Sequence, residues 1–146
     1  MIKEEQIDAQ VLAMQEPDFE DGFVEAAEEY WHYLNSESFQ GLSDKEHELL
    51  FFLNSVVYNV VEAAEGCSID FAMALFQDRE EDNWAVREEH NNWAGAADAF
   101  FEGHGEEDLL AFVEDMLNSE ESEDLTEIGK EVLFITTKSY IDLIIR

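Results

Sequence analysis

The chain has 146 residues, of which 46% are hydrophobic and 12% are aromatic, and its 37 Asp and Glu against 7 Lys and Arg give a formal charge of -30 at pH 7. This length suits one domain, and the aromatic content separates the chain from acidic disordered tails. The negative charge disfavours nucleic acid and anionic membranes as direct partners and favours cations and basic proteins.

Apolar residues three and four positions apart recur along nearly the whole sequence, which predicts an all-α fold. Pro17 suits the first turn of a helix, where its missing N–H does no harm. The helix that follows is predicted to end between residues 35 and 41. Its apolar stripe consists of Phe19, Phe23, Ala26, Ala27, Tyr30 and Leu34.

A capping box predicts the start of the next helix, because Ser43 and Glu46 are spaced to satisfy each other's open backbone donors. Apolar residues from Leu49 to Val61 then cover much of the helix circumference. This distribution predicts a central helix that is surrounded by others and stops near Gly66.

A shorter helix is expected to open at Ser68 or Asp70 and to carry apolar residues as far as Phe76. The acidic run at residues 80–82 predicts a break after it. From Trp84 the helical pattern continues to Phe101, and the small residues around Gly95 predict a close crossing with another helix.

The clearest amphipathic helix is predicted between Leu109 and Leu117. The last segment, from Leu125 to Ile145, is rich in β-branched residues, but its length and spacing favour a helix over a strand. No repeat and no Pro- or Gly-rich linker divides the chain. We therefore expect residues 1–146 to form a single-domain bundle of about six or seven helices.

The amino-terminal sequence MIKEEQID has neither the basic start nor the apolar stretch of a signal peptide, so we expect a cytoplasmic protein. The most apolar run, from Leu49 to Val61, is shorter than the roughly 20 residues of a membrane helix.

Cys67 is the only cysteine, which excludes an internal disulfide and a cysteine-rich zinc site. Surrounding carboxylates disfavour a reactive thiolate, so we expect Cys67 to be inert and partly buried.

A single ExxH spacing places Glu29 and His32 on one helix face, as in di-iron helical bundles. Such bundles need a second copy on a facing helix, and the nearest match has Asp44 before His47. With acidic residues this frequent, chance accounts for the pattern. A metal-binding bundle remains the alternative hypothesis, with Glu28, Glu29, His32 and His47 as its ligands.

The sequence contains none of the GxSxG, GxGxxG, P-loop, HExxH or EF-hand patterns that accompany nucleophilic, nucleotide, zinc or calcium chemistry. We therefore expect a protein that is not an enzyme and has no cofactor.

Trp31 and Tyr33 lie off the apolar stripe of their helix, which predicts that one of them is exposed at an interface.

Two long segments carry acidic residues without any Lys or Arg. The segment from Glu4 to Asp44 has 12 Asp or Glu, and the segment from Glu88 to Gly129 has 14. We expect the second to contact a basic protein, because opposite charge speeds encounter and excludes wrong partners. The predicted contact residues are Glu106, Glu107, Asp108, Glu114, Asp115, Glu120, Glu121, Glu123 and Asp124.

An acidic helix with a carboxylate every three residues carries one charge per ~4.5 Å, which is comparable to one strand of DNA. The hypothesis is therefore a binding module of the immunity, inhibitor or DNA-mimic type. Three alternatives stay open, namely a merely solvated surface, an adaptation to high salt and a structural protein whose acidic surface has no specific partner. The sequence leaves the oligomeric state open.

Overall fold

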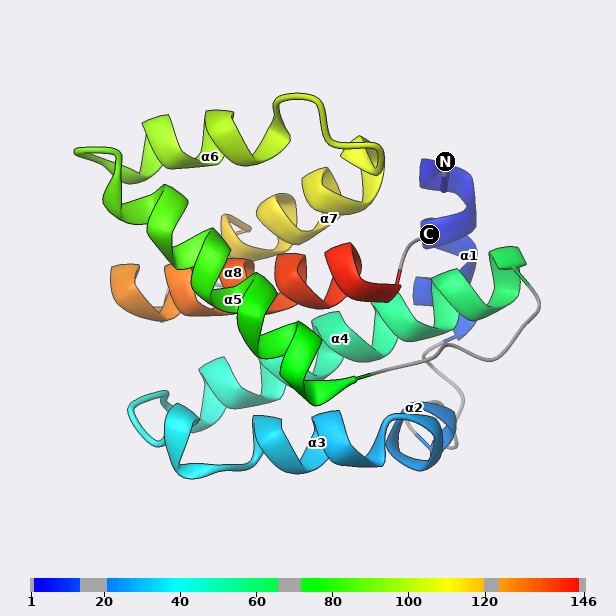
Figure 1. Cartoon of the computed structure of the whole chain (residues 1–146). Coiled ribbons are helices and arrows are strands. Elements are labelled where there is room, and N and C mark those ends of the chain that lie inside the picture. Colours follow the sequence, from blue (N-terminus) through cyan, green and yellow to red (C-terminus); the bar gives the residue numbers. More distant parts are fainter. Residues whose placement is uncertain (1, 14–20, 66–71, 120–123, 145–146) are drawn as a thin grey trace.

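The structure is a computed structural model, and it describes residues 2–13, 21–65, 72–119 and 124–144. These residues form eight α-helices, one short 3-10 helix and no strand, which confirms the all-α prediction (Figure 1). The expected count of six or seven helices was too low. The elements are α1 (Glu4–Ala13), α2 (Asp21–Ala26), α3 (Glu28–Leu34), η1 (Glu37–Phe39), α4 (Asp44–Glu65), α5 (Met73–Glu88), α6 (Trp93–Phe101), α7 (Glu107–Leu117) and α8 (Glu127–Ile144).

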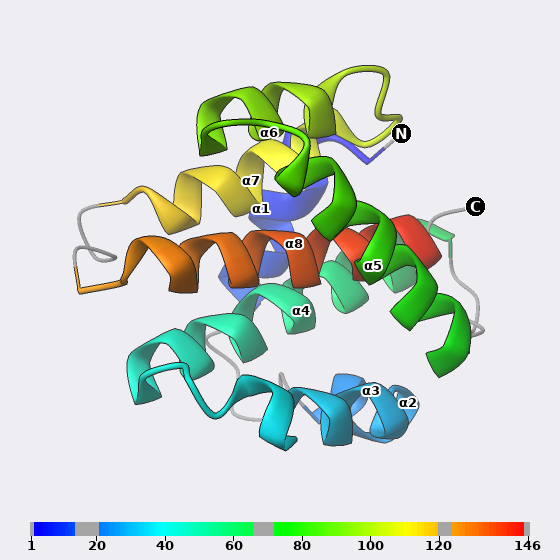
Figure 2. The same ribbon diagram turned by 60° about the vertical axis from the view of Figure 1, so that its left-hand side comes forward.

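Helices α4 and α8 form the centre of the molecule. Helix α8 packs against α4, α5 and α7, while α1 packs against α4 and α7 (Figure 2). The central position of α4 was predicted from its apolar circumference, and its residues from Leu50 to Val61 supply much of the core. Helix α8 is buried more completely, since every residue from Leu133 to Ile141 is buried. Packing on all sides therefore outweighs the modest helix propensity of its β-branched residues.

A buried polar chain links three helices through the core. The Tyr30 hydroxyl of α3 donates to Asn54 Oδ1 of α4 at 2.7 Å, and Asn54 Nδ2 donates to Thr137 Oγ1 of α8 at 3.3 Å. The Tyr30 ring also stacks on Tyr140 with centroids 4.2 Å apart. These contacts fix the register of α3, α4 and α8, because an unpaired polar group in the core would be costly.

The predicted capping box is present at the start of α4. Ser43 N donates to Glu46 Oε1 at 2.9 Å, and Glu46 N donates to Ser43 Oγ at 3.2 Å. The other carboxylate oxygen of Glu46 accepts from the backbone N and the hydroxyl of Thr126, at 3.2 and 3.0 Å. Thr126 Oγ1 in turn accepts from Gly129 N, so one carboxylate joins the starts of α4 and α8.

The apolar stripe predicted between Phe19 and Leu34 belongs to two helices rather than one. Phe23, Tyr30 and Leu34 are buried as predicted, but α2 ends at Ala26 and α3 begins at Glu28. Ala27 between them has φ -119° and ψ 40°, which lies outside the helical region. Pro17, Phe19, Gly66, Cys67 and the predicted helix starts at positions 68 and 70 lie outside the described residues.

The break expected at residues 80–82 is wrong, because α5 runs through them to Glu88. Glu80 is half-buried and accepts a hydrogen bond from the Tyr33 hydroxyl at 2.7 Å, while its two acidic neighbours are exposed. The chain instead turns after α5, where Asn92 Oδ1 accepts from Gly95 N and caps α6. A Cβ at Gly95 would meet this preceding turn first, 3.2 Å from His90 Nδ1, rather than another helix.

The helices predicted at 109–117 and 125–145 correspond to α7 and α8, with α8 beginning at Glu127 and residue 145 outside the described residues. Among the described residues, no helix combines the length and the apolar character that crossing a membrane requires.

Candidate functional site

The predicted contact residues that the structure describes do not form one surface. Glu120, Glu121 and Glu123 lie outside the described residues, and exposed Asp124 pairs with Lys45 at 2.9 Å. Glu107 is exposed in the first turn of α7, and Glu114 lines a hollow beside Lys130 of α8.

Glu106 was predicted to be a surface contact, and the structure corrects this. Its side chain is buried, with 6% of the residue exposed, at the start of α7. Glu106 Oε2 accepts a hydrogen bond from Ile2 N at 2.8 Å. This carboxylate therefore fixes the segment before α1 against α7 and is not available to a partner.

Asp108 and Asp115 instead line a groove between α1 and α7, which we name the acidic groove. It has a volume of about 240 Å³. The spacing of i, i+3, i+4 and i+7 places residues 108, 111, 112 and 115 on one side of α7. The groove is lined by Glu4, Ile7 and Asp8 of α1 and by Asp108, Ala111, Phe112 and Asp115 of α7.

The chain's two base-free segments meet in the acidic groove. Glu4 N donates to Asp108 Oδ2 at 3.2 Å, which holds the two helices together at one end. Buried Ile7 and half-buried Phe112 provide apolar surface beneath the four carboxylates. The described residues that line the groove include no Lys or Arg. Four carboxylates and an apolar surface therefore line the groove, and none of its described lining residues is cationic.

The residues of the alternative metal site are not brought together. On α3, His32 Nε2 lies 3.6 Å from Glu28 Oε1, but both side chains are mostly exposed, at 65% and 75%. On α4, His47 Nε2 lies 2.7 Å from the carbonyl oxygen of Leu34 and is engaged there. Within the described ranges, no three His, Cys, Asp or Glu side chains are grouped so that they could hold a metal ion.

Trp31 and Tyr33 are both half-buried and pack against the core, so neither is fully exposed as an interface anchor. The Trp31 ring lies 6.1 Å from Phe51, and the Tyr33 ring lies 5.5 Å from Phe76. Burial and the hydrogen bond to Glu80 raise the pKa of the Tyr33 hydroxyl well above its ordinary value. Tyr33 is therefore a neutral donor that links α3 to α5.

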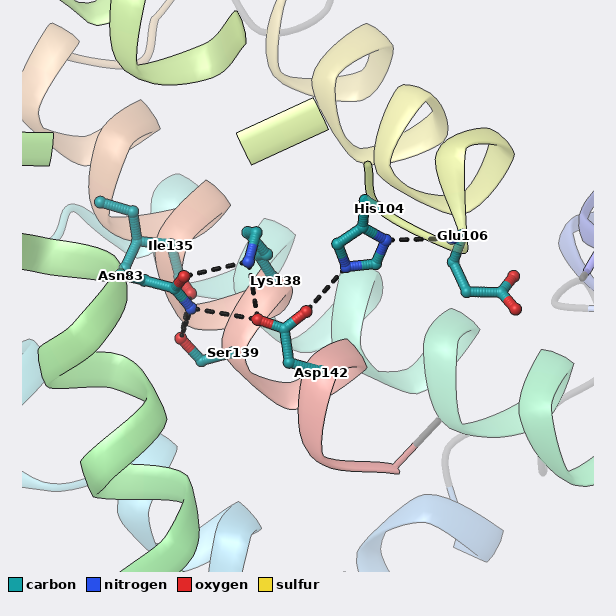
Figure 3. Close-up of polar contacts among 7 residues, drawn as sticks. All are labelled: Asn83, His104, Glu106, Ile135, Lys138, Ser139 and Asp142. Atoms are coloured by element: carbon teal, nitrogen blue, oxygen red, sulfur yellow. Dashed lines mark hydrogen bonds and ion pairs between the residues drawn. The ribbon is translucent and has the colours of Figure 1, made fainter. Parts of the chain in front are cut away.

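A buried ionic network between α5, α8 and the loop before α7 has no counterpart in the sequence predictions (Figure 3). Asp142 Oδ2 accepts from Lys138 Nζ at 2.7 Å and from Asn83 Nδ2 at 3.3 Å. Its Oδ1 lies 2.7 Å from His104 Nε2. Asn83 also accepts from Lys138 Nζ at 3.0 Å and donates to Ser139 Oγ at 2.9 Å. Each charge is therefore paired and hydrogen-bonded, as burial requires.

The contacts of His104 determine its tautomer. Glu106 N lies 3.0 Å from His104 Nδ1, and a backbone N–H can only donate. Nδ1 therefore accepts, and the neutral ring carries its proton on Nε2, from which it donates to Asp142. Because both ring nitrogens are occupied, His104 fixes the loop in position and has no free nitrogen for acid–base catalysis.

The carboxyl group of Asp142 is held in its ionised form. Burial alone would raise its pKa, but the hydrogen bond from His104 and the charge of Lys138 outweigh burial and hold the pKa below its ordinary value. The geometry and the direction of this shift both indicate a structural ion pair that fastens α8 to its neighbours.

One part of this network, the spacing of Lys138 and Asp142, could have been recognised in the sequence. Lys138 and Asp142 stand four residues apart inside the apolar run from Val132 to Ile144, a spacing that places them on one helix face. His104, between two glycines, gives no comparable signal. Its contact with Asp142 spans 38 residues and depends on how the loop packs.

No protein-family model matches the chain, and neither a curated protein nor a solved structure shows significant similarity to it.

Proposed function

We propose that this chain is a non-enzymatic helical protein that docks a basic protein partner through the acidic groove. One observation carries the proposal. Carboxylates from α1 and α7, which lie about a hundred residues apart in the sequence, gather beside an apolar surface, and the described residues that line the groove include no cation.

This arrangement suits a Lys or Arg side chain of the partner. The aliphatic stem of such a side chain packs on apolar surface while its charged end stays near solvent or an opposite charge. Ile7 and Phe112 supply the apolar surface, and Asp8 and Asp115 are exposed carboxylates beside it. The overall charge of -30 would add long-range attraction and a fast encounter.

The partner class follows from the same electrostatics. Proteins that bind nucleic acid present basic surfaces, and acidic helices match the charge spacing of a nucleic-acid strand. A nuclease or another nucleic-acid-binding protein is therefore the proposed kind of partner, and the chain would act as its inhibitor, immunity protein or DNA mimic.

The test compares two double variants that have the same net charge. Asp8→Asn with Asp115→Asn removes two groove carboxylates, while Asp78→Asn with Asp82→Asn removes two exposed carboxylates from α5. Each variant is titrated with a Lys- and Arg-rich peptide by calorimetry. We expect the groove variant to bind roughly tenfold more weakly than the α5 variant, because two contacts of about 0.5–1 kcal/mol are lost.

Equal affinities of the two variants would contradict the proposal, since attraction by the net charge alone cannot distinguish the groove from α5. The same result would favour a merely solvated surface or an adaptation to salt. Binding to the unchanged chain should also weaken steeply as salt is added, because salt screens exposed charges.

A further inference from the structure

A second hollow lies over the buried ionic network, and we name it the polar pocket. Its volume of about 370 Å³ falls at the lower end of the roughly 300–1,000 Å³ typical of small-molecule sites. Helices α5, α6 and α8 and the loop before α7 form its walls. Figure 3 shows His104, Lys138 and Asp142 converging in this part of the molecule.

Two cationic side chains line the polar pocket, in a chain that has 7 Lys and Arg altogether. The side chain of Arg79 in α5 is exposed and makes no hydrogen bond or ion pair with the described residues. Lys138 uses two of its three N–H donors for Asn83 and Asp142. One guanidinium and one remaining ammonium donor are therefore available for an anionic group.

The pocket also contains carboxylates and an apolar wall. Asp142 is engaged by its contacts in the network and buried Glu106 accepts from Ile2 N, whereas exposed Glu102 lines the pocket without a cationic partner among the described residues. Val86, Ala99 and Phe100 form the apolar part. Lys138 Nζ lies 5.3 Å from the centre of the Phe100 ring, so cationic and apolar surfaces adjoin.

We propose that the polar pocket binds a small zwitterion of the α-amino acid class with an apolar side chain. The ligand carboxylate lies between Arg79 and Lys138, since a guanidinium can hold a carboxylate through two parallel hydrogen bonds. Its ammonium group faces Glu102, and its side chain packs against Phe100. A zwitterion fits better than a free anion because its net charge is zero, so the field of a chain with charge -30 does not repel it.

The inner part of the site, formed by Lys138 and the loop of His104, is assembled before any ligand arrives. The network holds Lys138 and the loop of His104 in place through hydrogen bonds that are already satisfied, so binding need not order these groups. The polar pocket and the acidic groove share no lining residue, so the proposal of a small ligand does not depend on the basic partner proposed above.

The test uses the full chain and nuclear magnetic resonance titrations with valine, leucine, methionine and phenylalanine. Gly103 and Gly105 line the pocket, so their backbone amide signals report on it. We expect saturable shifts of these signals with at least one amino acid. Phenylalanine amide, which lacks the carboxylate, and 3-phenylpropanoate, which lacks the amine, should each bind at least tenfold more weakly than phenylalanine itself.

Two variants with equal net charge locate the site. Arg79→Gln should weaken binding by roughly 10- to 100-fold, the range expected when a charged hydrogen-bonding partner is lost. Lys130→Gln, in the first turn of α8 and outside the polar pocket, should leave affinity unchanged. The proposal is overturned if no amino acid gives a saturable shift, if 3-phenylpropanoate binds as tightly as phenylalanine, or if Arg79→Gln binds as the unchanged chain does.

Discussion

At Gly129, α8 lies so close to α4 that a Cβ atom would overlap the Glu46 carboxylate. Gly129→Ala should therefore displace Glu46 from its hydrogen bonds to Ser43 and Thr126. We expect the free energy of unfolding to fall by about 2–4 kcal/mol, from overpacking and from weakened hydrogen bonds to a charged group. Urea denaturation followed by circular dichroism measures this loss.

Gly41→Ala is the matched control for this substitution. A Cβ at Gly41 would have no neighbouring atom within 4 Å, and Gly41 is not among the glycines with positive φ. Its unfolding free energy should change by less than about 0.5 kcal/mol. If both alanine variants lost the same stability, backbone effects of glycine rather than the contact with Glu46 would be responsible.

Single residues were predictable where their partners are local. The capping box was predicted from Ser43 and Glu46 because they stand only three positions apart. Glu46 also accepts a hydrogen bond from Thr126. This contact depends on how α4 packs against α8, and no pattern in the sequence of either segment indicates it. Glu106 was misassigned to the surface for the same reason, since its buried position follows from its contact with Ile2.

Among the elements, α6 begins with a cap that a single substitution can test. Asn92 Oδ1 accepts from Gly95 N at 2.9 Å, and the helix it caps contributes Ala96 and Phe100 to the core. Asn92→Ala should lower the free energy of unfolding by about 1 kcal/mol, the usual cost of losing an N-cap. Urea denaturation measures the total loss, and amide hydrogen exchange in α6 locates it.

The neighbouring Asn91 provides the control, because it is exposed and makes no hydrogen bond with the described residues. Asn91→Ala should leave both measurements unchanged within error. A loss in Asn92→Ala no larger than in Asn91→Ala would mean that α6 is held by its packing alone and that the cap is dispensable.

The helix α7 was predicted well from its regular apolar stripe, because burial on one side fixes the period, and α4 was predicted well from the apolar residues around its circumference. Breaks were predicted less well. The acidic run in α5 suggested a loop, but a carboxylate is compatible with a helix whenever its side chain reaches solvent or a donor, as Glu80 reaches Tyr33. The turn after α5 is marked instead by Asn92, a capping residue that the sequence analysis overlooked.

For the whole molecule, the dominant quantity is the formal charge of -30. Mutual repulsion of the carboxylates opposes the compact state. Raising sodium chloride from 0.1 to 1 M shortens the screening length from about 10 Å to about 3 Å and should therefore stabilise the fold. We expect the melting temperature to rise by at least about 3 °C, which corresponds to about 1 kcal/mol for a domain of this size.

Potassium chloride should give the same increase, because screening depends on ionic strength and not on the cation. A melting temperature that stays flat or falls with salt would mean that repulsion is weak in the folded chain. An increase with sodium chloride alone would instead indicate a bound sodium ion.

Total charge and helical class could be read from composition and periodicity, which need no knowledge of tertiary contacts. The acidic groove could not be predicted in this way, because it depends on the pairing of α1 with α7. Sequence reasoning found Asp108 and Asp115 but not Glu4 and Asp8, which complete the groove from the other end of the chain. The polar pocket was missed because its residues come from three separate segments of the sequence.

The carboxylate of Glu46 also determines how the starts of α4 and α8 open. Its two oxygens are shared between Ser43 and Thr126, and the second contact joins residues 80 positions apart. If either helix frayed at its first turn, the other would lose part of its cap as well. The two helix ends should therefore open together as one cooperative unit, so exchange of their protected amides reports on the packing of both central helices.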